Sequence, residues 1–217
     1  MCYVVIAGGP NKDLSRILPR ITSAEKIICA DSGADALLPY DIVPDMVWGD
    51  MDSIRPETRA FLEKNQVSNR LFPIEKDMTD SELCLRSVPK EKKILFVTSL
   101  LGRLDHVMAN LLLTMRLREE GFDIVTTDGN TWVYPLSGKN HFVVPAEHVR
   151  AGNTCSLIPL GNGAAAVTTF GMKYSLKDHD IVPGSSLTVS NEFDLNEKEH
   201  GFDMNDGTML VIVTEKV

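Results

Sequence analysis

The chain lacks several features that would place it outside the soluble globular proteins. No apolar run reaches the length of a membrane span, and no basic segment followed by an apolar one opens the chain as a secretory signal would. The four cysteines, Cys2, Cys29, Cys84 and Cys155, lie far apart and form no C-x-x-C pair. Scattered thiols are typical of buried residues in a reducing cytoplasm rather than of disulfides or a zinc site. We therefore expect a soluble, cytoplasmic protein.

The sequence also lacks an excess of basic residues. Lys and Arg number 22 against 30 Asp and Glu, so the net charge is −8. This balance, without a basic run, argues against a nucleic-acid-binding surface. Internal repeats and low-complexity segments are absent too. The remaining composition is ordinary, with 43% hydrophobic and 24% charged residues, and 217 residues suffice for one large domain or two small ones.

Apolar runs alternate with helical patterns in the first half of the chain. Continuous apolar runs predict strands that are buried on both faces, and helical spacing with an early proline predicts helices between them. This alternation predicts an α/β architecture, with a mostly parallel, Rossmann-like sheet and helices on both faces. The expected strands are 3–7, 26–30, 46–48, 70–74, 94–98 and 123–127, and the expected helices cover 14–21, 56–66 and a stretch that ends near Glu120.

The composition changes after about residue 128. Nine of the fifteen glycines lie from there on, long helical patterns disappear, and short apolar runs recur between turn signals. This pattern is typical of an antiparallel β-sandwich. The net charge also divides: it is −3 before residue 128 (16 basic, 19 acidic) and −5 from residue 128 onward (6 basic, 11 acidic). We therefore predict two domains, 1–127 and 128–217, with strands in the second at 132–136, 141–144, 155–159, 165–169, 186–189 and 208–214.

Two carboxylates, Asp50 and Asp52, follow the short apolar run 46–48. Alternating residues of an extended segment point the same way, so both side chains can face one point. Two like charges about 4 Å apart repel by a few kcal/mol at a surface-like dielectric, and a divalent cation offsets that repulsion. The alternative is a pair of exposed loop acids that splay apart.

The positions of other polar residues favour the metal site. In a parallel sheet the carboxyl ends of the strands meet at one edge, where ligands bind. Short polar or glycine-rich stretches come directly after five of the expected strands, so we expect their loops to open on the same edge. They contain Gly8-Gly9, Asp31, Asp50 with Asp52, Asp77, and Arg103 with Asp105.

This set of residues suits a metal-bound polyphosphate. Carboxylates bind the cation, backbone amides bind phosphate oxygens, and a cation neutralises the transferred group. Candidate ligands of the metal, directly or through water, are Asp31, Asp50, Asp52, Asp77 and Asp80. Candidate phosphate-binding turns are Gly8-Gly9, which matches neither common glycine-rich phosphate motif, and Ser32-Gly33. Arg103 and Lys76 are the candidate cations.

Several of these residues also have structural explanations. Thr79 and Glu82 fit a capping box, in which Thr79 caps a helix and Glu82 reaches back. Asp105 is a favourable acid in the first turn of the next helix. His106 is more often a packed or hydrogen-bonded histidine than a ligand. Asn110, one turn further along, fits either the loop edge or a buried polar contact.

Four motifs taken together resemble the thiamine pyrophosphokinase family. They are Ala30-Asp31-Ser32-Gly33-Ala34-Asp35, Gly49-Asp50-Met51-Asp52-Ser53, Lys76-Asp77-Met78-Thr79-Asp80-Ser81-Glu82 and Gly102-Arg103-Leu104-Asp105-His106, in the family's order. The second half resembles the family's thiamine-binding module at Gly171-Met172-Lys173-Tyr174-Ser175-Leu176 and Ser190-Asn191-Glu192-Phe193. Tyr174 stands where the family often has tryptophan, and Leu101 departs from its usual GGR.

The resemblance implies ATP-dependent transfer of a pyrophosphoryl group to thiamine, with release of AMP. It also implies Mg²⁺ and a homodimer whose sites combine the catalytic half of one subunit with the sandwich half of the other. By motif position, the metal and catalytic cluster is Asp50, Asp52 and Asp77, with Arg103 also catalytic. The expected ATP contacts are Gly9, Asp31, Ser32, Gly33, Lys76, Thr79, Asp80, Arg103, Asp105 and His106, and the expected thiamine contacts are Tyr174, Ser190, Asn191 and Phe193.

Some alternatives stay open at this stage. Either Asp77 or Asp52 can accept the proton of the thiamine hydroxyl, and either Tyr174 or Phe193 can stack on thiamine. A metal-dependent phosphoesterase also uses paired acids, although only His106 lies near this cluster and such sites usually recruit more histidine. A non-catalytic sensor of thiamine or nucleotide is a third class, and the complete acidic set argues against it.

Overall fold

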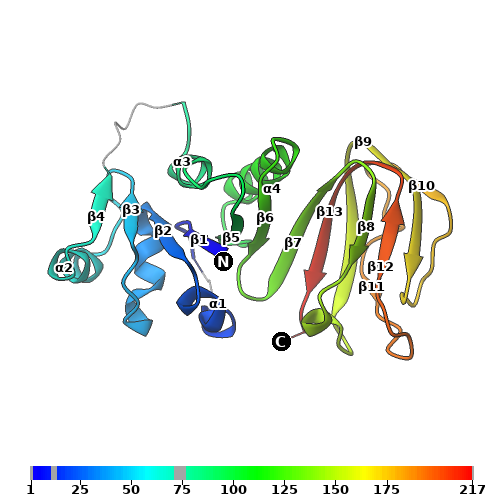
Figure 1. Cartoon of the computed structure of the whole chain (residues 1–217), viewed down its shortest axis with the longest axis horizontal. Helices are drawn as coiled ribbons and strands as arrows, with labels where there is room; N and C mark the ends of the chain where they lie inside the picture. Colours follow the sequence, from blue (N-terminus) through cyan, green and yellow to red (C-terminus); the bar gives the residue numbers. More distant parts are fainter. Residues whose placement is uncertain (1, 11–13, 71–76, 217) are drawn as a thin grey trace. The chain divides into compact units, whose positions relative to one another are not determined.

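The structure is a computed structural model that describes residues 2–10, 14–70 and 77–216. The chain divides into two compact units, Met1–Gly129 and Asn130–Val217 (Figure 1). Among the described residues, no helix is long and apolar enough to cross a membrane. The two units are considered separately below.

The first unit is built on a parallel sheet. Its strands lie in the order β4-β3-β2-β1-β5-β6, and each neighbouring pair is parallel. The predicted α/β class is therefore confirmed. The strand bounds are β1 Cys2–Ile6, β2 Lys26–Ala30, β3 Met46–Trp48, β4 Ser68–Arg70, β5 Lys93–Val97 and β6 Asp123–Thr127.

Helices cover both faces of this sheet, with α3 and α4 on one face and α1 on the other (Figure 1). Pro56 opens α2, where its fixed φ and missing N–H suit the first turn. Thr79 caps α3 by accepting a hydrogen bond from the backbone N–H of Glu82 at 3.2 Å. The bounds are α1 Leu18–Thr22, α2 Pro56–Lys64, α3 Asp80–Arg86 and α4 Leu104–Glu119, with 3₁₀ helices η1 Leu14–Arg16, η2 Asp31–Ala36 and η3 Leu38–Tyr40.

The core of the first unit explains its continuous apolar strands. Val4, Val5 and Ile6 are consecutive and fully buried, so both faces of β1 are covered. One face packs against Leu85 of α3 and Leu117 of α4. Burying each such side chain stabilises the fold by about 1.5–3 kcal/mol. The central strands are thus held rigidly, and the loops at their carboxyl ends are positioned by them.

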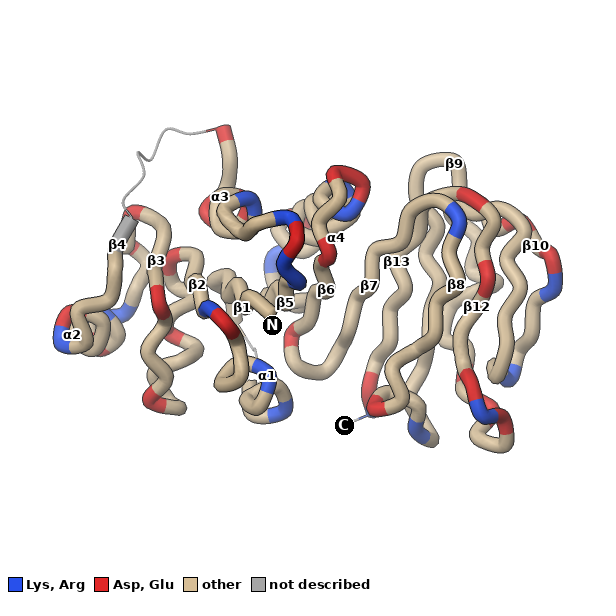
Figure 2. Tube along the Cα trace, viewed as in Figure 1, with Lys and Arg blue, Asp and Glu red and all other residues tan. Residues whose placement is uncertain are grey.

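The second unit consists of antiparallel strands, as predicted for this half of the chain. The strand order is β7-β13-β9-β12-β8, and β10 and β11 also pair with β9. Asp and Glu outnumber Lys and Arg along these strands and turns (Figure 2). The bounds are β7 Thr131–Ser137, β8 Asn140–Val143, β9 Thr154–Phe170, β10 His179–Ile181, β11 Asn191–Glu192, β12 Gly201–Met204 and β13 Asp206–Thr214, with a 3₁₀ helix η4 at Ala146–His148.

Several predicted strand boundaries are wrong. The runs 155–159 and 165–169 belong to one strand of 17 residues, β9, which pairs with β13 along its first part and with β12 at its end. The run 186–189 is a turn, although Thr188 exchanges hydrogen bonds with Leu157. The strands β10, β11 and β12 were not predicted, because short segments with few apolar residues give a weak pattern. Of the predicted strand 70–74, only residue 70 lies within the described residues, as the end of β4.

Candidate functional site

A cavity of about 670 Å³ opens at the carboxyl ends of β1 and β5. The chain runs outward from β1 through β2 and β3 to β4, and then returns to place β5 on the other side of β1. The strand order therefore reverses between β1 and β5, which is where open parallel sheets bind ligands. The volume lies within the range of about 300–1,000 Å³ that is usual for ligand pockets. The residues expected at ATP that line this cavity are Gly9, Asp31, Ser32, Thr79, Asp80, Arg103 and His106.

Three carboxylates gather beside this cavity. Oxygen atoms of Asp31, Asp50 and Asp52 lie within 4.8 Å of one another, and Asp31 also lines the cavity wall. The Ser53 hydroxyl donates a hydrogen bond to Asp31 Oδ2, whereas Asp31 Oδ1 is buried without a hydrogen-bond partner among the described residues. The pKa of Asp52 is raised, first by a side-chain hydrogen bond with Asp50 and then by the charge of Asp50.

The convergence of Asp50 and Asp52 does not arise from an extended segment, so that part of the prediction is wrong. Met51, between them, has a φ of 63°, and Asp31 has a φ of 46°. The backbone N–H of Asp52 donates to Asp50 Oδ1 at 3.1 Å, which closes a tight turn. A left-handed residue turns the chain sharply, and this turn brings the two carboxylates toward Asp31.

Two glycines allow the loops to approach one another. Gly49 has a φ of 142°, and a Cβ added there would lie 3.0 Å from the Cβ of Asp31. A Cβ at Gly8 would lie 2.5 Å from Ser32 Oγ, so the two turns predicted to bind phosphate lie side by side. Both positions need glycine because any side chain would push the acidic loops or the phosphate turns apart.

The group of three carboxylates, from Asp31, Asp50 and Asp52, fits a hard divalent cation. Its donors are oxygens, which such ions prefer, and within the part of the chain that the structure describes the buried Asp31 Oδ1 lacks the partner that a buried carboxylate oxygen normally has. An ion would satisfy that oxygen and offset the mutual repulsion of the three charges. Asp77 is exposed and is not a member of this group, and Lys76 lies outside the described residues.

An ion pair follows β5 at the start of α4. Arg103 Nη2 lies 2.6 Å from Asp105 Oδ2, and both side chains are well exposed. The hydrogen bond from Arg103 lowers the pKa of Asp105 and raises that of Arg103. Asp105 also lies in the first turn of α4, where an acid is favourable, so its structural explanation is confirmed. His106 is exposed at the cavity wall rather than packed.

The capping-box explanation holds for half of the motif at α3. The Thr79 hydroxyl caps the helix, but the Glu82 carboxylate accepts a hydrogen bond from Arg86 Nε at 2.8 Å. Arg86 also bonds both carboxylate oxygens of Glu120. Glu82 therefore serves the structure, as its sequence pattern suggested.

Part of the cavity wall is formed by residues that the sequence motifs do not include. Thr98 and Ser99 follow β5 directly and line the cavity, and Asn110 Nδ2 donates to Thr98 Oγ1 at 3.0 Å. Asn110 thus makes a polar contact and also faces the cavity. The signal that could have found Thr98 and Ser99 is their place at the carboxyl end of the clearest apolar run.

A second, smaller cavity of about 100 Å³ lies within the second unit, lined by Tyr174 and Asn191 among others. The side chain of Asn191 accepts from the Tyr174 backbone N–H at 3.0 Å and donates to the Tyr174 carbonyl at 2.7 Å. Tyr174 is 60% exposed, whereas Phe193 is 7% exposed and packs edge-on against His200. Ser190 has a φ of 59°, and its N–H donates to Ser156 Oγ.

Comparison with known proteins shows which family the chain resembles in each half. A family model described as the thiamin pyrophosphokinase catalytic domain matches residues 19–126, and one described as the thiamin pyrophosphokinase vitamin B1 binding domain matches residues 140–208. Thiamine pyrophosphokinase from Bacillus subtilis (strain 168) is 30% identical over 191 residues, covering 87% of each chain. Thiamine pyrophosphokinase 2 from Oryza sativa subsp. japonica is 28% identical over 207 residues, covering 83% of this chain and 76% of the relative.

A solved structure supports the same assignment. The crystal structure of thiamine pyrophosphokinase from Bacillus subtilis has a TM-score of 0.82 and 25% identity, covering 100% of both chains. The residues matched by the two family models fall in both units. The chain therefore belongs to the thiamine pyrophosphokinase family.

Proposed function

We propose that this chain transfers the pyrophosphoryl group of ATP to the hydroxyethyl oxygen of thiamine, forming thiamine diphosphate and AMP. The observation that carries the proposal is the group of three carboxylates beside a cavity at the switch point of the sheet. Family membership supports the same reaction. The first unit is then the ATP-binding and catalytic domain, and the second unit is the thiamine-binding domain.

Mg²⁺ is the proposed cofactor, with Asp50 and Asp52 as ligands together with Asp31, whose buried Oδ1 has no hydrogen-bond partner among residues 2–10, 14–70 and 77–216. Asp77 was expected in the same cluster and remains a candidate ligand from the loop before α3. When bound, a divalent cation neutralises phosphate charge and orients the transferred group. The residues themselves fix the direction of the oxygen donors through the turn at Met51.

The triphosphate of ATP is proposed to bind along the turns that follow β1, β2 and β5. Gly9, Ser32 and Gly33 present backbone groups where two turns lie side by side. Arg103 supplies a guanidinium group for developing negative charge, and Asp105 holds that group through the ion pair. The other proposed ATP contacts are Lys76, Thr79, Asp80 and His106.

Thiamine is proposed to bind at the small cavity of the second unit, with Tyr174 as its aromatic contact. Exposure favours Tyr174 over Phe193, whose ring is buried. Asn191 fixes the Tyr174 backbone, and Ser190 adjoins it. A cavity of about 100 Å³ is smaller than usual ligand pockets of about 300 Å³ or more, so a second wall is needed. We propose that a homodimer supplies this wall, as the family resemblance implies.

The proposed reaction forms a bond between the thiamine oxygen and the β-phosphorus of ATP. The bond from the β-phosphorus to the oxygen shared with the α-phosphate breaks, and AMP leaves with that oxygen. The proton of the hydroxyl passes to a carboxylate, either Asp52 or Asp77. A pH–rate profile of Asp77→Asn separates the two, because the limb that reports the base disappears only if Asp77 accepts the proton.

AMP formation tests the proposal directly. The protein is incubated with ATP, Mg²⁺ and thiamine, and AMP is followed with and without each component. AMP that appears only with thiamine and a divalent cation supports the kinase, and Asp52→Asn should abolish it while the fold is retained. Phosphate release without thiamine would indicate a hydrolase, and binding without product would indicate a sensor. Near-wild-type turnover in Asp52→Asn would refute the role of the carboxylate group.

We also propose a cytoplasmic location. The four cysteines lie far apart in the sequence, and three of them, Cys29, Cys84 and Cys155, are buried. Such thiols suit a reducing compartment. Labelling of thiols in intact cells against a cytoplasmic marker would test this point.

A further inference from the structure

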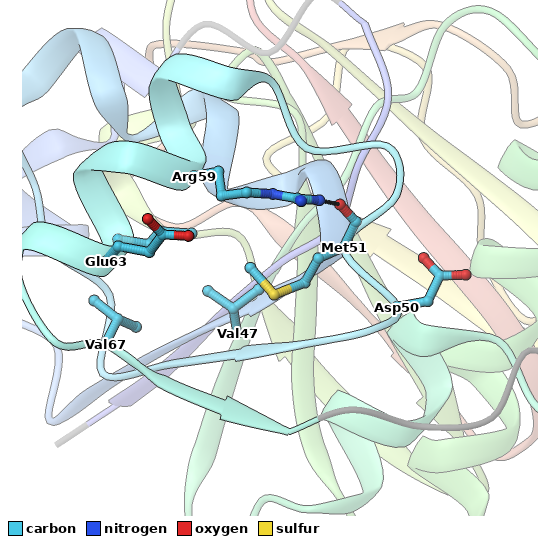
Figure 3. A pocket seen from close by; sticks show the side chains of 7 residues that line it. Val47, Asp50, Met51, Arg59, Glu63 and Val67 are labelled. Carbon is cyan, nitrogen blue, oxygen red and sulfur yellow. Dashed lines mark hydrogen bonds between the residues drawn. The ribbon is translucent and has the colours of Figure 1, made fainter.

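A basic residue of α2 contacts the backbone of the turn that carries the metal-binding acids. Arg59 Nη2 donates a hydrogen bond to the carbonyl oxygen of Met51 (Figure 3). Met51 is the residue between Asp50 and Asp52 in the sequence. Arg59 lies outside the lining of the ATP cavity and outside the group of three carboxylates.

The turn at Met51 needs an external support. A residue with a side chain rarely adopts a φ of 63°, so the free chain favours other conformations at this position. Rotation at Met51 would swing Asp50 and Asp52 relative to each other, because they lie on either side of it. In this left-handed conformation the Met51 carbonyl accepts the hydrogen bond from Arg59 of α2.

Side-chain packing gives this turn only partial support. The Met51 side chain is 9% exposed, but it borders a cavity of about 300 Å³ that Val47 and Leu62 also line. Figure 3 shows Met51 beside this cavity with Arg59 above it, and Asp50 also borders the cavity. A side chain that borders empty space has fewer contacts to hold it than one in a packed core. The hydrogen bond from Arg59 therefore adds a constraint on the turn to the one that the Asp52 N–H makes with Asp50 Oδ1.

The far end of the same loop is fixed separately. The backbone N–H of Arg55 donates to Asp35 Oδ1 at 3.2 Å, and its guanidinium group donates to the Asp35 carbonyl at 3.2 Å. These bonds anchor the start of α2 to η2, the element that begins with Asp31. Because these bonds hold the helix in place, the position of Arg59 is fixed, and its hydrogen bond fixes the direction of the Met51 carbonyl.

We propose that Arg59 is a positioning residue for the divalent cation, acting through the Met51 carbonyl to orient Asp50 and Asp52. The inference rests on the proposed function, since it takes these carboxylates as metal ligands. Residues that orient metal ligands usually change metal affinity by about 10-fold to 100-fold when they are replaced. Arg59 should therefore control metal affinity without contributing to thiamine binding.

The test compares Arg59→Gln with Lys64→Gln, which removes the same charge from an exposed position on the same helix. Binding of Mn²⁺, a probe with the oxygen preference of Mg²⁺, is measured by electron paramagnetic resonance on the full chain. Mg²⁺ activation of AMP formation, the KM for thiamine and the melting temperature are measured in parallel. We expect Arg59→Gln to weaken Mn²⁺ binding and raise the Mg²⁺ requirement by about 10-fold to 100-fold, with the thiamine KM unchanged.

Each other outcome overturns the inference. Mn²⁺ binding by Arg59→Gln equal to that of Lys64→Gln would exclude a positioning role, as would a lower melting temperature with unchanged metal affinity. Arg59→Lys keeps the charge on a shorter side chain without the guanidinium fork, so we expect intermediate affinity. If Arg59→Gln does not fold, wild-type affinity in Arg59→Lys overturns the inference. Failure of the wild-type chain itself to bind Mn²⁺ would instead refute the proposed metal site, and the inference with it.

Discussion

Replacement of Gly49 by alanine tests the geometry that brings the acidic loops together. The backbone at Gly49 has a φ of 142°, a conformation essentially reserved for glycine, and a side chain there costs about 1–3 kcal/mol. The added Cβ would also lie 3.0 Å from the Cβ and 3.3 Å from the Cα of Asp31. Relief of such overpacking typically costs a further 1 kcal/mol or more. We therefore expect Gly49→Ala to lower the free energy of unfolding by about 2–4 kcal/mol.

A matched control separates the two contributions. Gly138 also has a positive φ, 68°, but a Cβ added there would meet no atom within 4 Å. Gly138→Ala should therefore cost only the conformational part, about 1–2 kcal/mol. Urea denaturation gives both values, and the difference between the two variants reports the contact with Asp31 together with the rarer backbone conformation of Gly49.

The same variant should affect function as well as stability. Displacement of Asp31 from Asp50 and Asp52 should raise the Mg²⁺ concentration needed for AMP formation in Gly49→Ala, but not in Gly138→Ala. If Gly49→Ala and Gly138→Ala had equal stability and equal Mg²⁺ requirements, the close approach of the two loops would be refuted.

Three further predictions concern ion pairs and contacts elsewhere. Arg86→Gln should lower the melting temperature by roughly 2–4 °C at pH 7, and the difference from wild type should shrink in acid. The reason is that Arg86 lowers the pKa of Glu120 below its ordinary 4.5. The stabilisation is therefore present above pH 4.5 and is lost as Glu120 is protonated in acid. A melting-temperature difference that does not depend on pH would contradict this prediction. Asn191→Ala should raise the KM for thiamine but not for ATP in steady-state kinetics, because it frees the Tyr174 backbone; equal changes in both constants would contradict this. Asp31→Asn should weaken Mn²⁺ binding yet raise the melting temperature of the metal-free chain, since it removes a like charge from the group; a lower melting temperature would contradict the repulsion.

The fold of the first unit could be predicted from the sequence because its strands are buried on both faces. Lys26–Ala30 and Asp123–Thr127 are strands with the bounds that their apolar runs indicate. The strands of the second unit were harder to predict from the sequence, because buried and exposed residues alternate along them and the strands bend. Ser186–Val189 looks like a strand, but only Thr188 reaches β9, and Pro183-Gly184 precedes it in a turn. Local pattern cannot distinguish one paired residue from a paired strand.

The composition of the site was predictable, but its geometry was not. Asp31, Asp50 and Asp52 come directly after predicted strands, which predicted that they lie at one edge of the sheet. The structure brings them together. Their convergence depends on a left-handed Met51, which no periodicity in the sequence indicates. Arg59 was missed for the same reason, because its partner is a backbone carbonyl whose direction depends on that turn.

Backbone strain at these sites follows from what each position must do. Asp31, Met51 and Ser190 all have positive φ, at a cost of about 1–3 kcal/mol each, and all lie in the two candidate sites. Glycine would remove the strain at Asp31 but supply no oxygen for a cation. Met51 differs, because its side chain has no chemical role and glycine there would fit the backbone better. A glycine between Asp50 and Asp52 would, however, free the turn to rotate and leave the space that Met51 occupies empty. The strained methionine, held by Arg59, therefore lowers stability in exchange for a fixed direction of the two carboxylates.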